Sequence, residues 1–171
     1  MRFVEKTLKA CLSVAAVLAL AAPLPASAII RKGDPAPQFK VVSTSGQNIT
    51  LANYKGYVLV MDFFATWCPP CREAIPHLME LNQKYGKQGL QVLGLSADED
   101  GEKVVKEFVA EKRITYPVAL AGDSLMADYG LRSIPTMYVI NKKGVMVEKY
   151  MGFSDDMARS MEALIKKLLA E

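Results

Sequence analysis

The stretch FFATWCPPC at residues 63–71 decides the fold, because it joins an apolar strand pattern to two closely spaced cysteines. Residues 57–64 form a continuous apolar run that only Asp62 interrupts, a pattern typical of a buried strand. A helix is expected to begin near Cys68 and to end near Tyr85, where two glycines follow. The two cysteines are therefore predicted to lie at the start of a helix that follows a buried strand.

A pair of cysteines three residues apart can close to a disulfide and reopen. The thiolate is the attacking species, and a helix N-terminus lowers the pKa of a thiol. Cys68 is therefore the candidate nucleophile, and Cys71, one turn into the helix, is the candidate resolving thiol. Pro69 and Pro70 suit the first helical turn but supply no N–H groups. A purely structural bridge is a poor explanation, because so short a loop removes little entropy from the unfolded chain.

The N-terminus has the pattern of a secretory signal peptide. Basic residues precede an uncharged apolar run at 10–22, and a small-residue cleavage site follows at 26–28. We predict a signal peptide at residues 1–28 and one domain at residues 29–171, located in the periplasm or another extracytoplasmic space. Cleavage would remove Cys11 and leave the two motif cysteines alone in the mature chain. An uncleaved segment that anchors the protein is the alternative.

The order of patterns along the mature chain predicts an α/β fold with a mainly parallel sheet covered on both faces. The terminal hairpin, with its turn at 141–144, is expected to add antiparallel pairing at one side of this sheet. Strands are expected at 39–42, 49–51, 57–64, 90–95, 117–120, 137–140 and 145–150. Helices are expected at 68–85, after 97–100, at 124–129 and after Ser154. The first two strands would form an N-terminal hairpin. Residues 98–101, DEDG, lack the full spacing of an EF-hand loop and are interpreted as a helix cap.

Charge and ligand counts argue against two classes of binding protein. Beyond residue 28 the chain has 18 basic and 17 acidic residues without a basic stripe, so no nucleic-acid partner is expected. A zinc site takes four ligands, whereas the mature chain offers two cysteines and His77. No metal and no other cofactor are therefore expected, and His77 is interpreted as a packing or surface residue.

The motif at 67–71 resembles the active site of the thioredoxin superfamily, and four other residues match at the family's spacings. Asp62 occupies the position of the buried acid on the family's central strand. Pro76 matches the proline that kinks the active-site helix, and Pro135, within SIPT, matches the family's cis-proline. Gly152 matches a glycine common after the last strand. The resemblance covers about residues 34–171 and implies a thioredoxin-like fold, a central mixed sheet flanked by helices.

Within that superfamily, the chain is most similar to the exported ResA/TlpA/CcmG-like branch. The N-terminal hairpin and the sequence FFATWC at 63–68 resemble those of this branch, and residues 97–129 resemble its inserted helix–strand unit. Members of the branch often carry a glutamate three residues after the second cysteine, where this chain has Ala74. The proton-accepting role is therefore assigned to Asp62 instead.

A buried acid in an apolar strand has a raised pKa, so Asp62 is expected to accept the proton of Cys71 when that thiol attacks a mixed disulfide. The resemblance implies that a cis Pro135 places the backbone of Ile134 beside the cysteines, where a client chain can pair as an added strand. The alternatives are an Asp62 at a strand edge, solvated or bonded to Lys or Tyr, and a trans Pro135. The remaining candidate contacts with a client are Trp67, Pro69 and Pro70.

The predicted function is that of an exported, monomeric thiol–disulfide oxidoreductase. The resemblance implies a reductant of client disulfides, for example in cytochrome c maturation, that depends on a membrane-bound thiol electron donor. The same residues also support a disulfide-forming oxidase of the DsbA kind, so the direction of transfer stays open. A non-catalytic client-binding module is a further alternative. A peroxiredoxin-like peroxidase is disfavoured, because Met61, preceded by Val60, stands where its motif requires proline.

Overall fold

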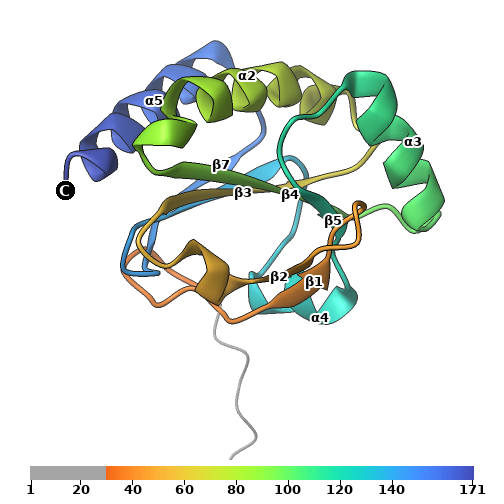
Figure 1. Ribbon diagram of the computed structural model, residues 1–171, viewed down its shortest axis with the longest axis horizontal. Helices are drawn as coiled ribbons and strands as arrows, with labels where there is room; N and C mark the ends of the chain where they lie inside the picture. Colours follow the sequence, from red (N-terminus) through yellow and green to blue (C-terminus); the bar gives the residue numbers. More distant parts are fainter. Residues whose placement is uncertain (1–29) are drawn as a thin grey trace, which may run out of the picture.

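The computed structural model describes residues 30–171, so the predicted signal segment at 1–28 lies outside the described residues. Within the described part, a five-stranded sheet forms the centre and helices cover it (Figure 1). The strands are β1 Lys40–Val42, β2 Asn48–Thr50, β3 Val58–Phe64, β4 Leu90–Ser96, β5 Val118–Leu120, β6 Thr136–Ile140 and β7 Met146–Met151. The α-helices are α2 Pro69–Tyr85, α3 Glu102–Lys112, α4 Asp123–Asp128 and α5 Asp155–Leu169, and short 3-10 turns span Leu51–Tyr54 and Gly86–Gln88.

The central sheet has the strand order β5-β4-β3-β6-β7. Strand β4 runs parallel to both β3 and β5, whereas β6 runs antiparallel to both β3 and β7. The mixed sheet implied by the resemblance is confirmed. The expected mainly parallel sheet with antiparallel pairing in the terminal hairpin is also confirmed: within the central sheet β6 alone runs against the other strands, because it begins at the edge where β3 ends, with Thr136 opposite Phe63.

Strand β3 lies at the centre of the molecule, and all seven of its residues are buried. Val60 and Phe64 pack on the face covered by α2, α3 and α5. Met61 and Phe63 pack on the opposite face, against the N-terminal segment and α4. A strand that is covered on both faces has a continuous apolar sequence, and for this reason β3 could be predicted from its composition.

The N-terminal hairpin is confirmed, because β1 pairs antiparallel with β2, and Ser43 just beyond β1 bridges to Ala119 of β5. The segment at 97–129 forms α3, β5 and α4, and β5 takes the edge of the central sheet. This segment is the inserted helix–strand unit expected from the resemblance. It covers the side of the sheet beyond β4, so that β4 is interior and buried.

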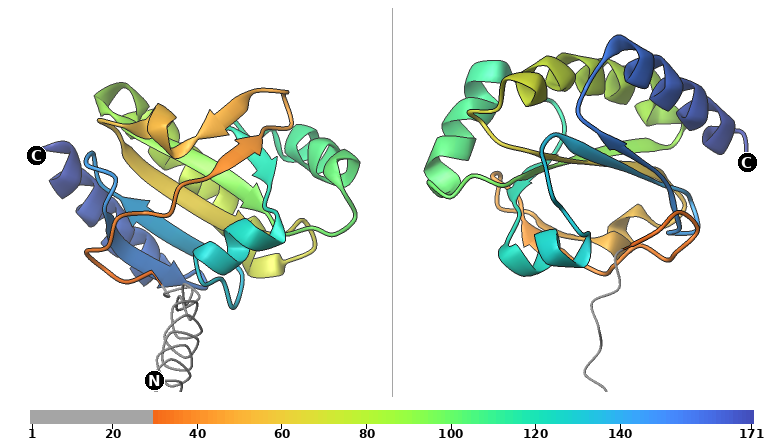
Figure 2. Two further views of the ribbon diagram at one scale, coloured as in Figure 1. Left: turned by 90° about the horizontal axis from the view of Figure 1, so that it is seen from below. Right: turned by 180° about the vertical axis from the view of Figure 1, so that it is seen from behind.

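Helices α2 and α5 lie side by side on one face of the sheet (Figure 2). Glu162 on α5 joins them by accepting hydrogen bonds from Lys84 Nζ at 2.8 Å and Tyr85 Oη at 2.5 Å. Ser154 caps α5 as predicted, because its Oγ accepts a hydrogen bond from the Met157 N–H. Within residues 30–171, no helix combines the length and the apolar character needed to cross a bilayer.

Candidate active site

Cys68 and Cys71 form a disulfide at the N-terminus of α2, with their Cα atoms 5.3 Å apart. Cys68 is the N-cap residue, and Pro69 and Pro70 occupy the first turn, where a missing N–H costs no helical hydrogen bond. Cys71 is fully buried, whereas Cys68 is 3% exposed. Both cysteines are thus buried, and Cys68 is the one that retains exposed surface.

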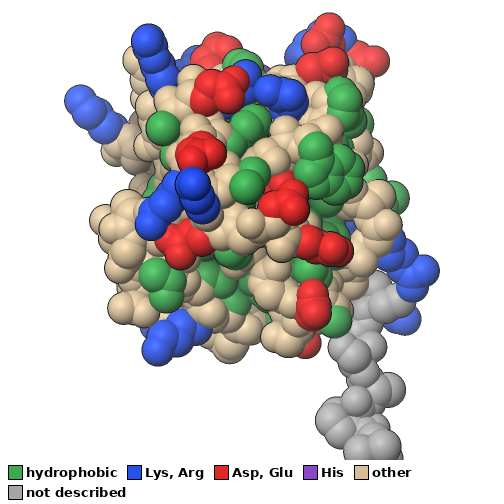
Figure 3. Space-filling view, turned by 90° about the vertical axis from the view of Figure 1, so that its right-hand side faces the viewer, with side chains coloured by type: hydrophobic (Ala, Val, Ile, Leu, Met, Phe, Trp, Pro, Cys, Tyr) green, Lys and Arg blue, Asp and Glu red, His purple; other side chains and the backbone are tan. Residues whose placement is uncertain are grey.

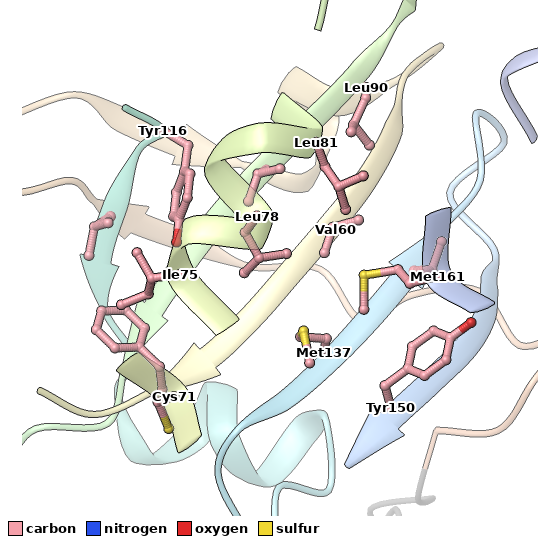
Figure 4. Packing of buried hydrophobic residues seen from close by; sticks show 14 of the residues in the cluster. Val60, Cys71, Ile75, Leu78, Leu81, Leu90, Tyr116, Met137, Tyr150 and Met161 are labelled. Atoms are coloured by element: carbon pink, nitrogen blue, oxygen red, sulfur yellow. The ribbon is translucent and has the colours of Figure 1, made fainter. Parts of the chain in front are cut away.

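Asp62 lies on β3 beneath the same helix and is fully buried. Its side chain shares a face of β3 with Val60 and Phe64, the face that Cys71 also contacts. In Figure 4, β3 runs from Val60 toward Cys71. Asp62 follows Val60 by two positions on β3 and therefore lies on the same face. Neither carboxylate oxygen has a hydrogen-bond partner among residues 30–171. The solvated strand-edge alternative is therefore wrong.

Burial alone raises the pKa of Asp62 from 3.8 to about 7. The cause is the loss of water around the charged form, and neither carboxylate oxygen is hydrogen-bonded within the described part of the chain. A carboxyl group with a pKa near neutrality can both accept and release a proton under ordinary conditions. Asp62 is therefore chemically suited to exchange a proton with a thiol on the same buried face.

The Ile134–Pro135 peptide bond is cis, so the trans alternative is wrong. Pro135 is buried, and its carbonyl accepts a hydrogen bond from the Gly152 N–H at 2.8 Å. The Thr136 hydroxyl donates to the Ser133 carbonyl at 2.7 Å, which fixes the other side of the loop. This loop precedes β6 at the edge of the sheet where β3 ends. It therefore lies on the same side of the molecule as the disulfide.

Exposed apolar side chains lie at this edge of the sheet. Trp67, directly before the disulfide, is 65% exposed, and Pro69 and Pro70 are also exposed. Met151 is 60% exposed and lies opposite Thr136 in the β6–β7 pairing. Sequence analysis missed Met151, although its place at the end of the last strand, next to Gly152, was a usable signal. Figure 3 shows this side of the molecule, where hydrophobic side chains lie among Asp and Glu groups.

The predicted helix cap at residues 98–101 is confirmed in position, since Gly101 is the N-cap residue of α3, but Asp98 does not cap the helix and instead holds the active-site loop. Its Oδ2 accepts a hydrogen bond from the Thr66 N–H at 2.9 Å, and its Oδ1 accepts one from Thr66 Oγ1 at 2.6 Å. Ser96 Oγ also donates to Oδ2, at 2.6 Å. Helix α3 begins after Gly101, which contributes no capping side chain. The carboxylate therefore fixes the backbone two residues before Cys68.

The other residues singled out on α2 have structural positions. Pro76 lies within the helix, and His77 is half-buried with its ring centroid 6.0 Å from that of Phe153, so the packing interpretation of His77 is confirmed. Ala74 is fully buried, whereas the neighbouring Glu73 is exposed. The first turns of α2 therefore place no carboxylate against Cys71, and Asp62 on β3 supplies the buried acid of this face.

Comparison with known proteins places this geometry in a family. The family model described as Redoxin matches residues 31–165. The thiol-disulfide oxidoreductase ResA of Bacillus anthracis is 34% identical over 137 residues, which cover 80% of this chain and 78% of ResA. The thioredoxin-like protein YneN of Bacillus subtilis is 32% identical over 124 residues, which cover 72% of this chain and 73% of YneN.

Solved structures show the same relationship. A protein of Chlorobium tepidum, proposed to be the thiol:disulfide interchange protein DsbE, matches with a TM-score of 0.77 and 28% sequence identity. The match covers 82% of this chain and 99% of that protein. Both kinds of comparison extend over almost all of the described residues, including the disulfide and the cis-proline loop. The chain thus belongs to the redoxin family, in the ResA/CcmG-like part of the thioredoxin superfamily, and is a thiol–disulfide oxidoreductase.

Proposed function

We propose that this protein is an exported reductant of client disulfides, in which Cys68 forms the mixed disulfide and Cys71 resolves it. The observation that carries the proposal is the buried Asp62 carboxyl, whose pKa is about 7. An acceptor for the proton of Cys71 favours attack by Cys71 on the mixed disulfide, the step that releases a reduced client. The signal-peptide pattern of residues 1–28 supports export, with an uncleaved anchor as the alternative.

The reaction transfers two electrons from the protein dithiol to the client. The Cys68 thiolate attacks one client sulfur, which breaks the client disulfide and releases one client thiolate that takes up a proton. Asp62 then accepts the proton of Cys71, and the Cys71 thiolate attacks Cys68 Sγ. The second client thiolate leaves and is protonated, and the Cys68–Cys71 disulfide remains. An external dithiol must reduce this disulfide, and we assign that task to a membrane-bound thiol donor.

The client is expected to bind along the cis-proline loop. An extended client segment can pair with the backbone of Ile134, because that residue precedes Pro135 and lies outside the pairings of β6, which begin at Thr136. Trp67 is exposed beside Cys68 and offers an apolar contact. Pro69 and Pro70 form the solvent-facing first turn of α2 and provide further apolar surface. Backbone pairing depends little on which side chains the client carries, so this mode of binding suits clients of varied sequence.

The test is a thiol count on a disulfide-bonded client peptide after incubation with the reduced protein lacking residues 1–28. The wild type should generate two peptide thiols, and Cys68→Ser should generate none. Cys71→Ser should accumulate a peptide adduct on Cys68 that mass spectrometry detects. Client reduction by Cys68→Ser, or an adduct on any other residue, would contradict the proposed roles.

The same peptide distinguishes the alternatives. An oxidase would leave the client disulfide intact and would instead oxidise the reduced peptide when supplied in its Cys68–Cys71 disulfide form. A non-catalytic binding module would bind the client peptide as tightly in the Cys68→Ser variant as in the wild type. Asp62→Asn separates the proton transfer from binding. It should slow release of the client from the mixed disulfide severalfold at neutral pH while leaving formation of the adduct intact.

A further inference from the structure

Two buried polar side chains beneath α2 are unpaired in the described part of the chain. They are the carboxylate of Asp62 and the hydroxyl of Tyr116. Tyr116 is 4% exposed and belongs to the same buried cluster as Cys71 and Ile75. In Figure 4 its ring extends from the segment before β5 into the space beneath α2, with the hydroxyl directed toward Ile75. Unpaired buried polar groups are rare in native structures, so two in one cluster call for an explanation.

Strand register places these two groups next to each other. Asp62 of β3 lies opposite Gly94 of β4 in the parallel pairing. A Cβ atom added to Gly94 would lie 3.3 Å from Tyr116 Cε2, so the ring occupies the place where a side chain at position 94 would neighbour Asp62. Cε2 is one bond from the carbon that carries the hydroxyl, and adjacent strands are only about 4.8 Å apart. The absence of a side chain at Gly94 therefore leaves room for Tyr116 beside Asp62.

On α2, His77 Nε2 is also buried and unpaired within the described residues, and its ring packs against Phe153. The other polar groups around this face are already engaged. Tyr85 donates its hydroxyl to Glu162 on α5, and the Tyr150 hydroxyl of β7 pairs with Ser160. Asp98, beyond β4, is held by Ser96 and Thr66. Opposite Asp62 on β6 is Met137. The remaining residues of α3 and α5 in this cluster are Val105, Phe108, Met161, Ile165 and Leu168, which are apolar.

Among the described residues of this cluster, Tyr116 and the two cysteines are thus the groups with free hydrogen-bonding capacity near Asp62. The cysteines are joined in the disulfide and do not titrate in that state. Burial, and secondarily the charge of Asp62, raises the pKa of Tyr116 well above its usual value. Tyr116 therefore stays protonated across the physiological range and keeps its capacity as a donor.

We propose that Tyr116 is a positioning residue that donates a hydrogen bond to the Asp62 carboxylate when Asp62 is ionised. The inference rests on the proposed function, in which the ionised form accepts the proton of Cys71. A donor to the charged form favours that form, so Tyr116 sets the lower pH limit at which Asp62 can act as a base.

The test is a titration of the Asp62 carboxyl carbon by NMR in the oxidised, full-length mature protein labelled with carbon-13 at aspartate. The disulfide removes both cysteines from the titration, so the midpoint reports Asp62 and does not depend on client turnover. Tyr116→Phe removes one oxygen and keeps the ring. It should raise the midpoint by about one pH unit, the size expected for loss of one hydrogen bond to a charged group.

Tyr150→Phe is the matched control, because it removes a buried hydroxyl whose partner is Ser160. This control should leave the Asp62 midpoint unchanged. An unchanged midpoint in Tyr116→Phe, or equal shifts in both variants, would overturn the proposal. If the midpoint shifts while the protein reduces no client peptide, the Tyr116 inference stands and the proposed function fails.

A kinetic measurement adds a readout that a structural role of Tyr116 would not give. The rate of mixed-disulfide resolution in Tyr116→Phe should show its acid limb displaced upward by the same pH interval as the NMR midpoint. The rate at the alkaline plateau should match the wild type, because Asp62 is then ionised in both proteins. A uniform decrease at every pH would instead indicate disturbed packing and contradict the assigned role.

Discussion

Replacing Asp62 by asparagine should stabilise the protein in mildly alkaline solution and change its stability little in acid. Burial raises the pKa of Asp62 from 3.8 to about 7, so between these values the folded protein keeps a proton that the unfolded chain releases. Folding stability therefore decreases as the pH rises from about 4 to about 7, and the penalty is complete above that range. A difference of about three pKa units corresponds to about 4 kcal/mol.

The assay is urea unfolding of the oxidised wild type and Asp62→Asn at a series of pH values. The free energies of unfolding should nearly coincide at about pH 4 and separate by several kcal/mol, in favour of the variant, at about pH 8. Asp100→Asn, which changes an exposed acid, should retain the wild-type dependence on pH. If the curves for wild type and Asp62→Asn run parallel across the series, Asp62 does not ionise at an abnormal pH and the argument is refuted.

Three further substitutions test the supporting structure by urea unfolding. Asp98→Asn should lower the free energy of unfolding by about 1–3 kcal/mol, because the amide nitrogen cannot accept a hydrogen bond from Thr66 or Ser96. It should also slow client reduction, and an unchanged rate would refute the loop-anchoring role. Gly94→Ala should cost about 1–3 kcal/mol, since its Cβ would lie 3.0 Å from Val118 Cγ2, whereas Gly122→Ala, with open space around it, should cost less. Ser154→Ala should lower the free energy of unfolding by about 1 kcal/mol, because α5 loses its N-cap. A urea midpoint equal to that of the wild type would show that the cap is dispensable.

The elements around the disulfide could be predicted because their signals are local. A strand covered on both faces gives an apolar run, so the single acid Asp62 stands out within β3. Two cysteines before a helical pattern, with Pro69 and Pro70 between them, mark the start of α2. The cis form of Pro135 followed from the resemblance of its loop, and not from composition. Each of these features is contained within a few consecutive residues.

The features that were missed depend on strand register. Asp98 was interpreted as a helix cap because acidic residues before a helical pattern are typical of N-termini. It contacts Thr66 instead because Ser96 lies opposite Phe64, which brings two chain segments about thirty residues apart to one edge. The place of Tyr116 beside Asp62 likewise follows from the pairing of β3 with β4 and from the glycine between them. The order of residues along the chain does not by itself reveal which strands pair.

The equilibrium reduction potential of the Cys68–Cys71 pair tests the proposed direction of transfer most directly. It can be measured on the protein lacking residues 1–28 by equilibration with dithiothreitol or glutathione and counting of free thiols. We predict a value near or below about −250 mV, as for proteins that reduce disulfides. A value near about −120 mV, that of the oxidant DsbA, would contradict the proposed reductant and identify a disulfide-forming oxidase.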